Sequence, residues 1–143
     1  GYRRGTENLP AAIGFAVALA AGFDWLVEAK RLRYILHEAL SAEGGEIVAE
    51  HSNRLATIGS YRMPGVAASS QLINFDMAGI AVSAGSACSS GTLKTSHVLG
   101  AMGWDSKAAS EVIRVSFGPE TNELEVMRFV EVWRSISARA KAA

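Results

Sequence analysis

The distribution of apolar and polar residues predicts two helices in the first 45 residues of the chain. Residues 9–21 are apolar nearly all round, which is typical of a helix that other elements bury on several sides. Asn8 is its predicted N-cap, with Pro10 in the first turn, and Gly22 should bend or break it. A second, amphipathic helix is expected to follow and to end at residues 43–45. Its apolar stripe consists of Trp25, Leu26, Ala29, Leu32, Ile35 and Leu36.

Short apolar segments predict a few short strands in the rest of the chain. They cover residues 46–50, 54–63, 80–82 and 111–117. The last of them, EVIRVSF, is the clearest, because its apolar residues alternate along the strand. Ile113, Val115 and Phe117 should therefore face a core. Arg114 should point to the opposite side with Val112 and Ser116.

Short helices should connect these strands. One is expected after the Pro64-Gly65 turn, capped by Ser69 or Ser70, with Leu72, Ile73 and Met77 turned inward and Gly79 at its end. Others should run from Ser96 to Gly103 and from Thr121 toward the C-terminus. The predicted fold class is therefore α+β (an α/β two-layer arrangement), with helices packed on a small mixed or antiparallel sheet in a single domain, residues 1–143.

Composition and charge narrow the class of protein. The 143 residues are 49% hydrophobic and 20% charged, which fits one globular domain with a core. Lys plus Arg (14) equals Asp plus Glu (14), and no basic run exceeds Arg3-Arg4, so no nucleic-acid partner is expected. The single cysteine cannot form an internal disulfide. A reducing, cytoplasmic location is the simpler interpretation.

The N-terminal region has a second interpretation. Arg3-Arg4 followed by the apolar residues 9–23 resembles the start of a signal peptide. Charged residues from Asp24 onward interrupt it too early for a membrane span. The chain also begins without Met, and Pro10 favours a helix start. We therefore predict a buried helix with no membrane partner, in a chain that is a fragment of a longer one.

The only cysteine, Cys88, lies in SAGSACSSGT (83–92), a stretch of side chains no larger than threonine. Such residues shield a thiol poorly and permit many backbone conformations, so an accessible, mobile loop is expected. A nucleophilic role needs a lowered pKa or a nearby base, and Lys94 and His97 are close in sequence. The residues alone equally allow an exposed, inert thiol.

Two further residues could bind an anion. An arginine in an apolar strand is costly to bury unless it meets an anion, and the planar guanidinium of Arg114 suits a carboxylate. The alternative is an edge-strand arginine that reaches solvent. Thr6, in RRGTEN just before a predicted helix, could bind a phosphate group, or it could simply contribute to capping.

Several segments together resemble the C-terminal part of NifS/IscS-type cysteine desulfurases, which belong to the class V aminotransferase group of pyridoxal-phosphate enzymes. These segments are RRGTENLPAAIGFAVAL, PGV followed by AGIAVSAGSACSSG, SHVLGAMG and IRVSFG, in that order. The extended cysteine loop resembles the NifS/IscS type rather than the SufS type. The resemblance implies the small C-terminal domain of a fold-type I enzyme together with its interdomain helix.

The resemblance also implies roles for individual residues. Cys88 matches the nucleophile that takes sulfur from L-cysteine as a persulfide, and in some members this cysteine also ligates an iron–sulfur cluster shared with a scaffold protein. Arg114 matches the arginine that holds the substrate carboxylate. Thr6 matches a threonine that reaches the cofactor phosphate in the partner subunit of a homodimer. His97 receives no catalytic role.

The implied reaction converts L-cysteine to L-alanine and supplies sulfur to an acceptor for iron–sulfur cluster or thio-cofactor assembly, with pyridoxal 5'-phosphate as cofactor. The family's Schiff-base lysine lies in an N-terminal domain that no segment here resembles. We therefore expect this chain to be inactive alone. The alternatives are a related enzyme, namely a selenocysteine lyase or another class V aminotransferase, and a non-catalytic binding domain whose Cys88 is incidental or redox-sensing.

Overall fold

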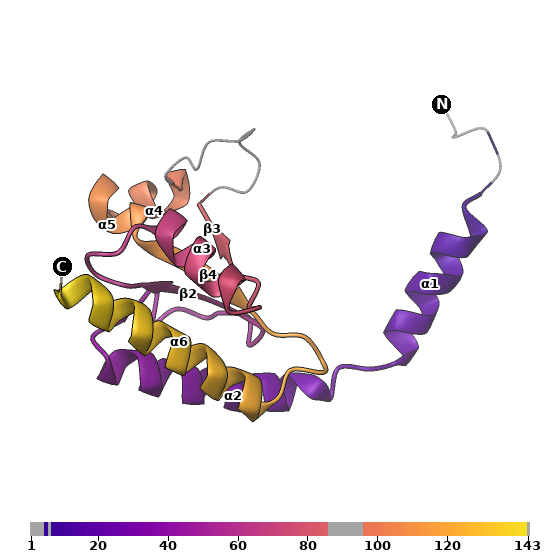
Figure 1. The fold of residues 1–143 in the computed structure, drawn as a ribbon. Helices are drawn as coiled ribbons and strands as arrows, with labels where there is room; N and C mark the ends of the chain where they lie inside the picture. Colours follow the sequence, from indigo (N-terminus) through magenta and orange to yellow (C-terminus); the bar gives the residue numbers. More distant parts are fainter. Residues whose placement is uncertain (1–4, 6, 86–95, 143) are drawn as a thin grey trace.

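A computed structural model describes residues 5, 7–85 and 96–142. Helices and a small sheet make up this part of the chain (Figure 1). In chain order the elements are α1 (Leu9–Ala20), α2 (Trp25–Ala42), β1 (Glu46–Ile47), β2 (Ile58–Arg62), α3 (Ala68–Met77), β3 (Ser83–Ala84), α4 (His97–Ala101), α5 (Ser106–Ser110), β4 (Val112–Ser116) and α6 (Glu123–Ala142). The predicted α+β class is confirmed.

The four strands of the described sheet lie in the order β1-β2-β4-β3, and every neighbouring pair is antiparallel. The two central strands, β2 and β4, pair along five residues, from Ile58 opposite Ser116 to Arg62 opposite Val112. The outer strands are only two residues long. The predicted strand at 80–82 is wrong, because pairing with β4 begins only at Ser83.

One face of the sheet carries the main core. Side chains from α2, α3 and α6 pack there against alternate residues of β2 and β4. Tyr61, Ile113 and Trp133 are wholly buried in this layer. Figure 1 shows α2 and α6 side by side, and these two helices are in contact. The alternation predicted for residues 111–117 is thus confirmed, with Val115 and Phe117 on the buried side.

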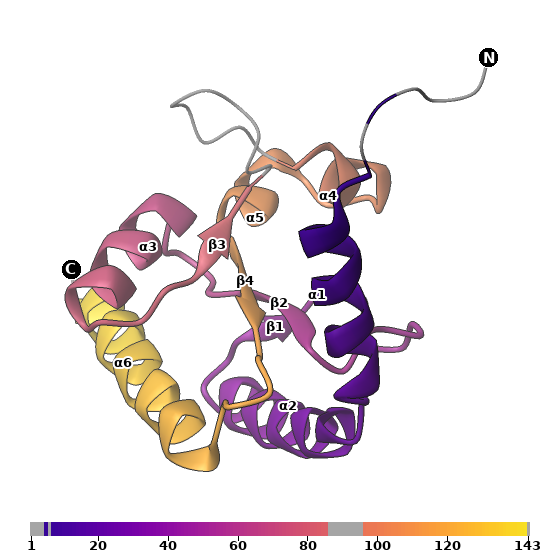
Figure 2. The same ribbon diagram turned by 90° about the vertical axis from the view of Figure 1, so that its right-hand side faces the viewer.

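The opposite face of the sheet is covered only in part. A small second cluster joins Val48 and Val112 to Leu99 of α4 and Ala109 of α5. These two short helices lie together at one end of the sheet (Figure 2). Arg114 and Ser116, farther along β4 on this same face, are exposed. This open part of the sheet contains the candidate site.

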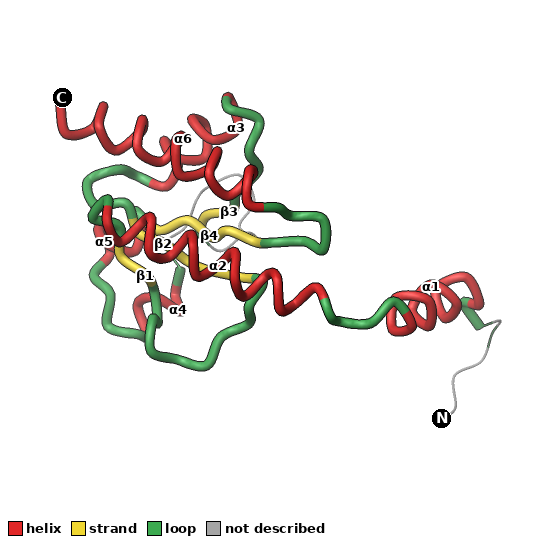
Figure 3. The backbone as a smooth tube through the Cα atoms, turned by 90° about the horizontal axis from the view of Figure 1, so that it is seen from below, coloured by secondary structure: helices red, strands yellow, loops and turns green. Residues whose placement is uncertain are grey.

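Helix α1 departs from the prediction of a helix buried on several sides. It begins as expected, with the Asn8 side chain accepting a hydrogen bond from the Ala11 amide at 3.1 Å. None of its residues is buried, however, and Figure 3 shows it projecting from the rest of the fold. The chain turns by 71° between α1 and α2, and Gly22 there has φ +75°. In the described part of the chain, no other element buries α1.

No described helix alone is both long and apolar enough to cross a membrane. Helices α1 and α2 meet those two criteria only as a bent pair.

Helix α3 presents a different face to the core from the one predicted. Ala68, Gln71 and Phe75 are buried, whereas Ile73 and Met77 are 62% and 83% exposed. The buried amide of Gln71 explains this orientation, because its Nε2 donates to the carbonyl oxygens of Val66 and Glu111, each at 2.8 Å. A polar side chain thereby anchors the helix to the sheet.

Candidate functional site

Arg114 occupies the middle of the sheet on its open face. It lies on β4 directly opposite Ser60 of β2 on one side and Ser83 of β3 on the other. Because β4 is an interior strand, the alternative of an edge-strand arginine is wrong. The side chain of Arg114 is nevertheless exposed, as the alternation of the strand predicted.

A cavity of about 270 Å³ adjoins Arg114. Strands β2 and β4 and helix α4 contribute to its walls, together with residues on both sides of the segment that contains the cysteine. The lining residues are Val48, Ser60, Gly85, Ser96, Val98, Leu99, Met102, Val112, Ile113 and Arg114. Arg114 is the one charged residue among them. As far as the described residues line it, the cavity therefore offers one positive charge in mostly apolar and hydroxyl-bearing surroundings.

The guanidinium of Arg114 has no hydrogen bond or ion pair with the described part of the chain. Other arginines here are engaged: Arg62 pairs with Glu46 and Glu111, and Arg31 with Glu28 and Glu123. An unpaired guanidinium beside a cavity can bind an incoming carboxylate through two parallel hydrogen bonds. This arrangement suits recognition of a small carboxylic acid.

The other predicted site residues are placed only in part. Cys88, Thr6 and Lys94 lie outside the described residues. His97 is the first residue of α4 and is exposed, and it does not line the cavity next to its neighbour Ser96. The structure therefore brings Arg114 together with the two described residues that flank segment 86–95.

Two residues beside Arg114, Ser60 and Ser83, were not singled out from the sequence. Alternation in IGSYR does place Ser60 on the face opposite Tyr61. Which strand neighbours β4, and in which register, depends on pairing between distant segments, which alternation alone does not specify. Only the strand pairing seen in the structure places both hydroxyls next to Arg114.

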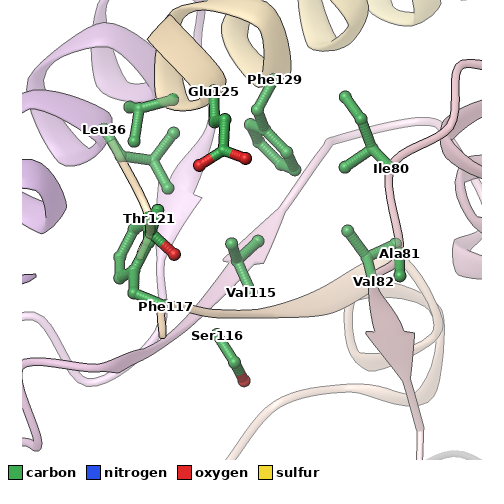
Figure 4. A pocket seen from close by; sticks show the side chains of 11 residues that line it. Leu36, Ile80, Ala81, Val82, Val115, Ser116, Phe117, Thr121, Glu125 and Phe129 are labelled. Carbon is green, nitrogen blue, oxygen red and sulfur yellow. The ribbon is translucent and has the colours of Figure 1, made fainter. Parts of the chain in front are cut away.

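A second pocket lies on the other side of β4. It has a volume of about 150 Å³ and is bounded by β4, residues 80–82 and the first turns of α6. Figure 4 shows Val115 directed into this pocket and Ser116 directed away from it. Since Arg114 and Ser116 share a strand face, the strand separates this apolar pocket from the cavity beside Arg114.

The partly buried His37 packs against Tyr61 of the main core, away from Arg114. Their rings meet edge to face, with centroids 5.4 Å apart. Burial, with added repulsion from Arg54 and Arg33, lowers the pKa of His37 to about 4. Burial also raises the pKa of Tyr61 well above its usual value. His37 is thus partly buried, whereas His51 is exposed in a turn.

The described residues bear only in part on the metal and cofactor predictions. They contain no group of three or more His, Cys, Asp or Glu side chains arranged to hold a metal ion. The described lysines, Lys30, Lys107 and Lys141, are exposed, and none lines the cavity. This part of the chain offers Arg114 as a possible partner of a carboxylate. It does not supply a lysine that could hold pyridoxal phosphate there.

The family follows from comparison with known proteins. The model of the aminotransferase class-V family matches residues 1–129, which is most of the chain. The chain belongs to this family. Among curated members, it is 34% identical to cysteine desulfurase IscS 1 of Archaeoglobus fulgidus and 35% identical to the IscS-like cysteine desulfurase of Mycobacterium tuberculosis. Each alignment covers 99% of this chain and 38% of the relative.

Solved structures of NifS-like proteins share the fold. The NifS-like protein from Rickettsia africae matches with a TM-score of 0.81 and 30% identity over 95% of this chain, and another NifS-like protein with 0.80 and 29% over 96%. This chain covers 36% of each of those chains. The sequence therefore corresponds to a little over a third of its relatives, whose remaining parts it does not span.

Proposed function

We propose that this chain is the substrate-carboxylate-binding and sulfur-carrying part of a cysteine desulfurase that converts L-cysteine to L-alanine. The supporting observation is Arg114, which has no partner among the described residues and lies beside a cavity whose walls include Gly85 and Ser96. These are the two described residues between which the chain containing Cys88 runs. A carboxylate-binding group and a thiol could thus act on the same small substrate.

Arg114 would fix the substrate by its carboxylate. An interior strand holds its backbone in place, and the guanidinium can form two parallel hydrogen bonds to a carboxylate. The amino and thiol groups of cysteine would then project from a fixed point. Such positioning is a large part of catalysis when two groups must meet.

Cys88 would accept the sulfur. Three peptide units separate it from Gly85, and consecutive Cα atoms are 3.8 Å apart, so the two Cα atoms are within about 11 Å of each other in any conformation. The Cys88 thiolate would attack the sulfur of the substrate as its C–S bond breaks. The bonding electrons would stay with the substrate carbon, which takes up a proton to give alanine, and Cys88 would keep the sulfur as a persulfide. The persulfide would then pass to an acceptor for iron–sulfur cluster or thio-cofactor assembly.

Pyridoxal phosphate, when bound, supplies the electron sink for breaking the C–S bond. Its lysine would come from the part of the relatives that this chain does not span. We assign Thr6 to the cofactor phosphate of a partner subunit, which makes a homodimer the working form. We also include in the proposal a cytoplasmic location and a further role of Cys88 as ligand to an iron–sulfur cluster shared with a scaffold protein.

The test uses the complete enzyme loaded with pyridoxal phosphate. With Cys88→Ser, the absorbance of the bound cofactor should persist, whereas mass spectrometry after addition of cysteine should find no persulfide on the protein. Arg114→Ala should raise the KM for cysteine by roughly a hundredfold, because a charge-assisted bidentate contact is lost. Continued sulfur transfer by the Cys88→Ser enzyme would refute the carrier role of Cys88.

A further inference from the structure

We propose that the hydroxyl groups of Ser60 and Ser83 complete the carboxylate site of Arg114 by donating hydrogen bonds to the same substrate oxygens. The inference rests on the proposed function and adds two substrate-positioning residues to it. Both serines come from strands that neighbour β4, so they approach the guanidinium from opposite sides.

Strand pairing carries the geometric argument. Residues directly opposite each other in antiparallel strands point to the same face, with Cβ atoms about 4.5–5.5 Å apart. Ser60 and Ser83 are each such a partner of Arg114. Both are half-buried, and Ser60 also lines the cavity. A carboxylate bound to the guanidinium on this face would therefore lie within reach of both hydroxyls.

The chemistry of the carboxylate supports the same assignment. An ionised carboxylate offers about four acceptor sites, and a bidentate arginine satisfies only two of them. Inside a mostly apolar cavity, an acceptor that loses water without gaining a donor weakens binding. Hydroxyls beside the arginine would satisfy the remaining acceptor sites, and small side chains leave room for the ligand.

Ser96 and Ser116 provide the comparison. Ser96 also lines the cavity, but it precedes α4 and does not lie opposite Arg114 in the sheet. Ser116 shares the strand and the face of Arg114, yet its partner in β2 is Ile58, two positions along. Neither is brought alongside the guanidinium by strand pairing, so Ser116→Ala is a matched control for a serine on the same exposed surface.

The experiment measures binding to the 143-residue chain itself. The probe is mercaptopropionate, which has the thiol and carboxylate of cysteine but lacks its amino group. Mercaptoethanol, which lacks the carboxylate, is the reference ligand. Affinities are obtained from NMR titration of the Arg114 Nε–H signal, or of β4 amides where that side chain is replaced. Far-ultraviolet circular dichroism and the urea midpoint show whether each variant is folded.

Ser60→Ala and Ser83→Ala should each weaken mercaptopropionate binding by up to about tenfold, and Ser116→Ala should leave it unchanged. Ser83→Thr should restore binding, since the hydroxyl returns on a side chain that suits a strand. In an Arg114→Ala background, the serine substitutions should have much smaller effects, because the groups act on one carboxylate. Binding of mercaptoethanol should not respond to any of these changes.

Two other outcomes have separate meanings. If the folded serine variants bind mercaptopropionate like the unchanged chain, while Arg114→Ala weakens it, the inference about the serines is wrong and the role of Arg114 stands. If Arg114→Ala itself leaves the affinity unchanged, the carboxylate-binding part of the proposed function fails, and the inference fails with it.

Discussion

Arg62 and Glu111 form an ion pair at the start of β4, with Nη2 of Arg62 2.8 Å from Oε2 of Glu111. The Glu111 side chain is only 5% exposed, and Arg62 also reaches Glu46 of β1 at 2.9 Å. A single guanidinium thus links β1, β2 and the beginning of the strand that carries Arg114. The pair helps to hold the candidate site on a defined sheet.

Arg62→Met should lower the free energy of unfolding by about 3 kcal/mol, because it leaves a nearly buried carboxylate without its cation. Urea denaturation monitored by circular dichroism measures the change. Arg134→Met is the control, since it breaks a more exposed pair with Glu43 (2.6 Å) and should cost less than about 1 kcal/mol. Equal losses in the two variants would mean that Glu111 is not stabilised by Arg62.

Gly59 of β2 should not tolerate a larger residue. A Cβ atom at this position would lie 2.2 Å from the hydroxyl oxygen of Tyr61, a side chain that is wholly buried. Gly59→Ala should therefore destabilise the chain by about 1–3 kcal/mol through overpacking. Gly100→Ala in α4, where a Cβ would meet no atom within 4 Å, should be neutral or slightly stabilising. Thermal denaturation compares the two, and a neutral Gly59→Ala would contradict the packing described.

His37 should make folding stability depend on pH. Its pKa is about 4 in the folded chain, against an ordinary value of 6.5, because burial disfavours the charged ring. Between these pH values the unfolded chain binds a proton that the folded chain does not. The free energy of unfolding therefore falls as the pH drops from 6.5 toward 4, by an amount of order 1 kcal/mol for this half-buried group.

The variant His37→Phe should remove that contribution, so that its stability declines less than that of the unchanged chain over this pH range. Urea denaturation at several pH values gives the difference, in which titrating carboxylates common to both chains cancel. His51→Gln, at an exposed position, should keep the original pH dependence. If the free energy of unfolding of His37→Phe changed with pH in parallel with that of the unchanged chain, His37 would have the same pKa in the folded and unfolded chains.

The sequence could predict the faces of β4 because alternation is a local property of the chain. Ile113 and Val115 face the core, and Arg114 faces away, as their spacing indicates. The neighbours of Arg114 could not be predicted in this way, since they depend on the register between strands distant in sequence. Ser60 lies 54 positions from Arg114 and becomes its neighbour only when the sheet forms.

Errors in the helix predictions have a similar origin. Gln71 is buried because its amide binds the carbonyl groups of Val66 and Glu111. The apolar pattern of α3 alone does not indicate these hydrogen bonds. For α1, the apolar composition correctly indicated a helix, but whether anything covers it depends on the rest of the assembly. Hydrophobicity alone predicts that a surface prefers to be buried, and it does not identify the partner.

Helix α1 should make the chain associate with itself in solution. Its exposed large apolar side chains include Ile13 and Val17 on one side of the helix and Phe15 on the other, each more than half exposed, and exposed apolar surface of this kind promotes association. Sedimentation velocity over a concentration series should show oligomers that Phe15→Lys shifts toward monomer, because a charge interrupts the apolar surface. Val27→Lys adds the same charge at a position that is 77% exposed on α2, and it should have little effect. A monomeric chain at all concentrations, or equal effects of the two lysines, would show that α1 does not drive association.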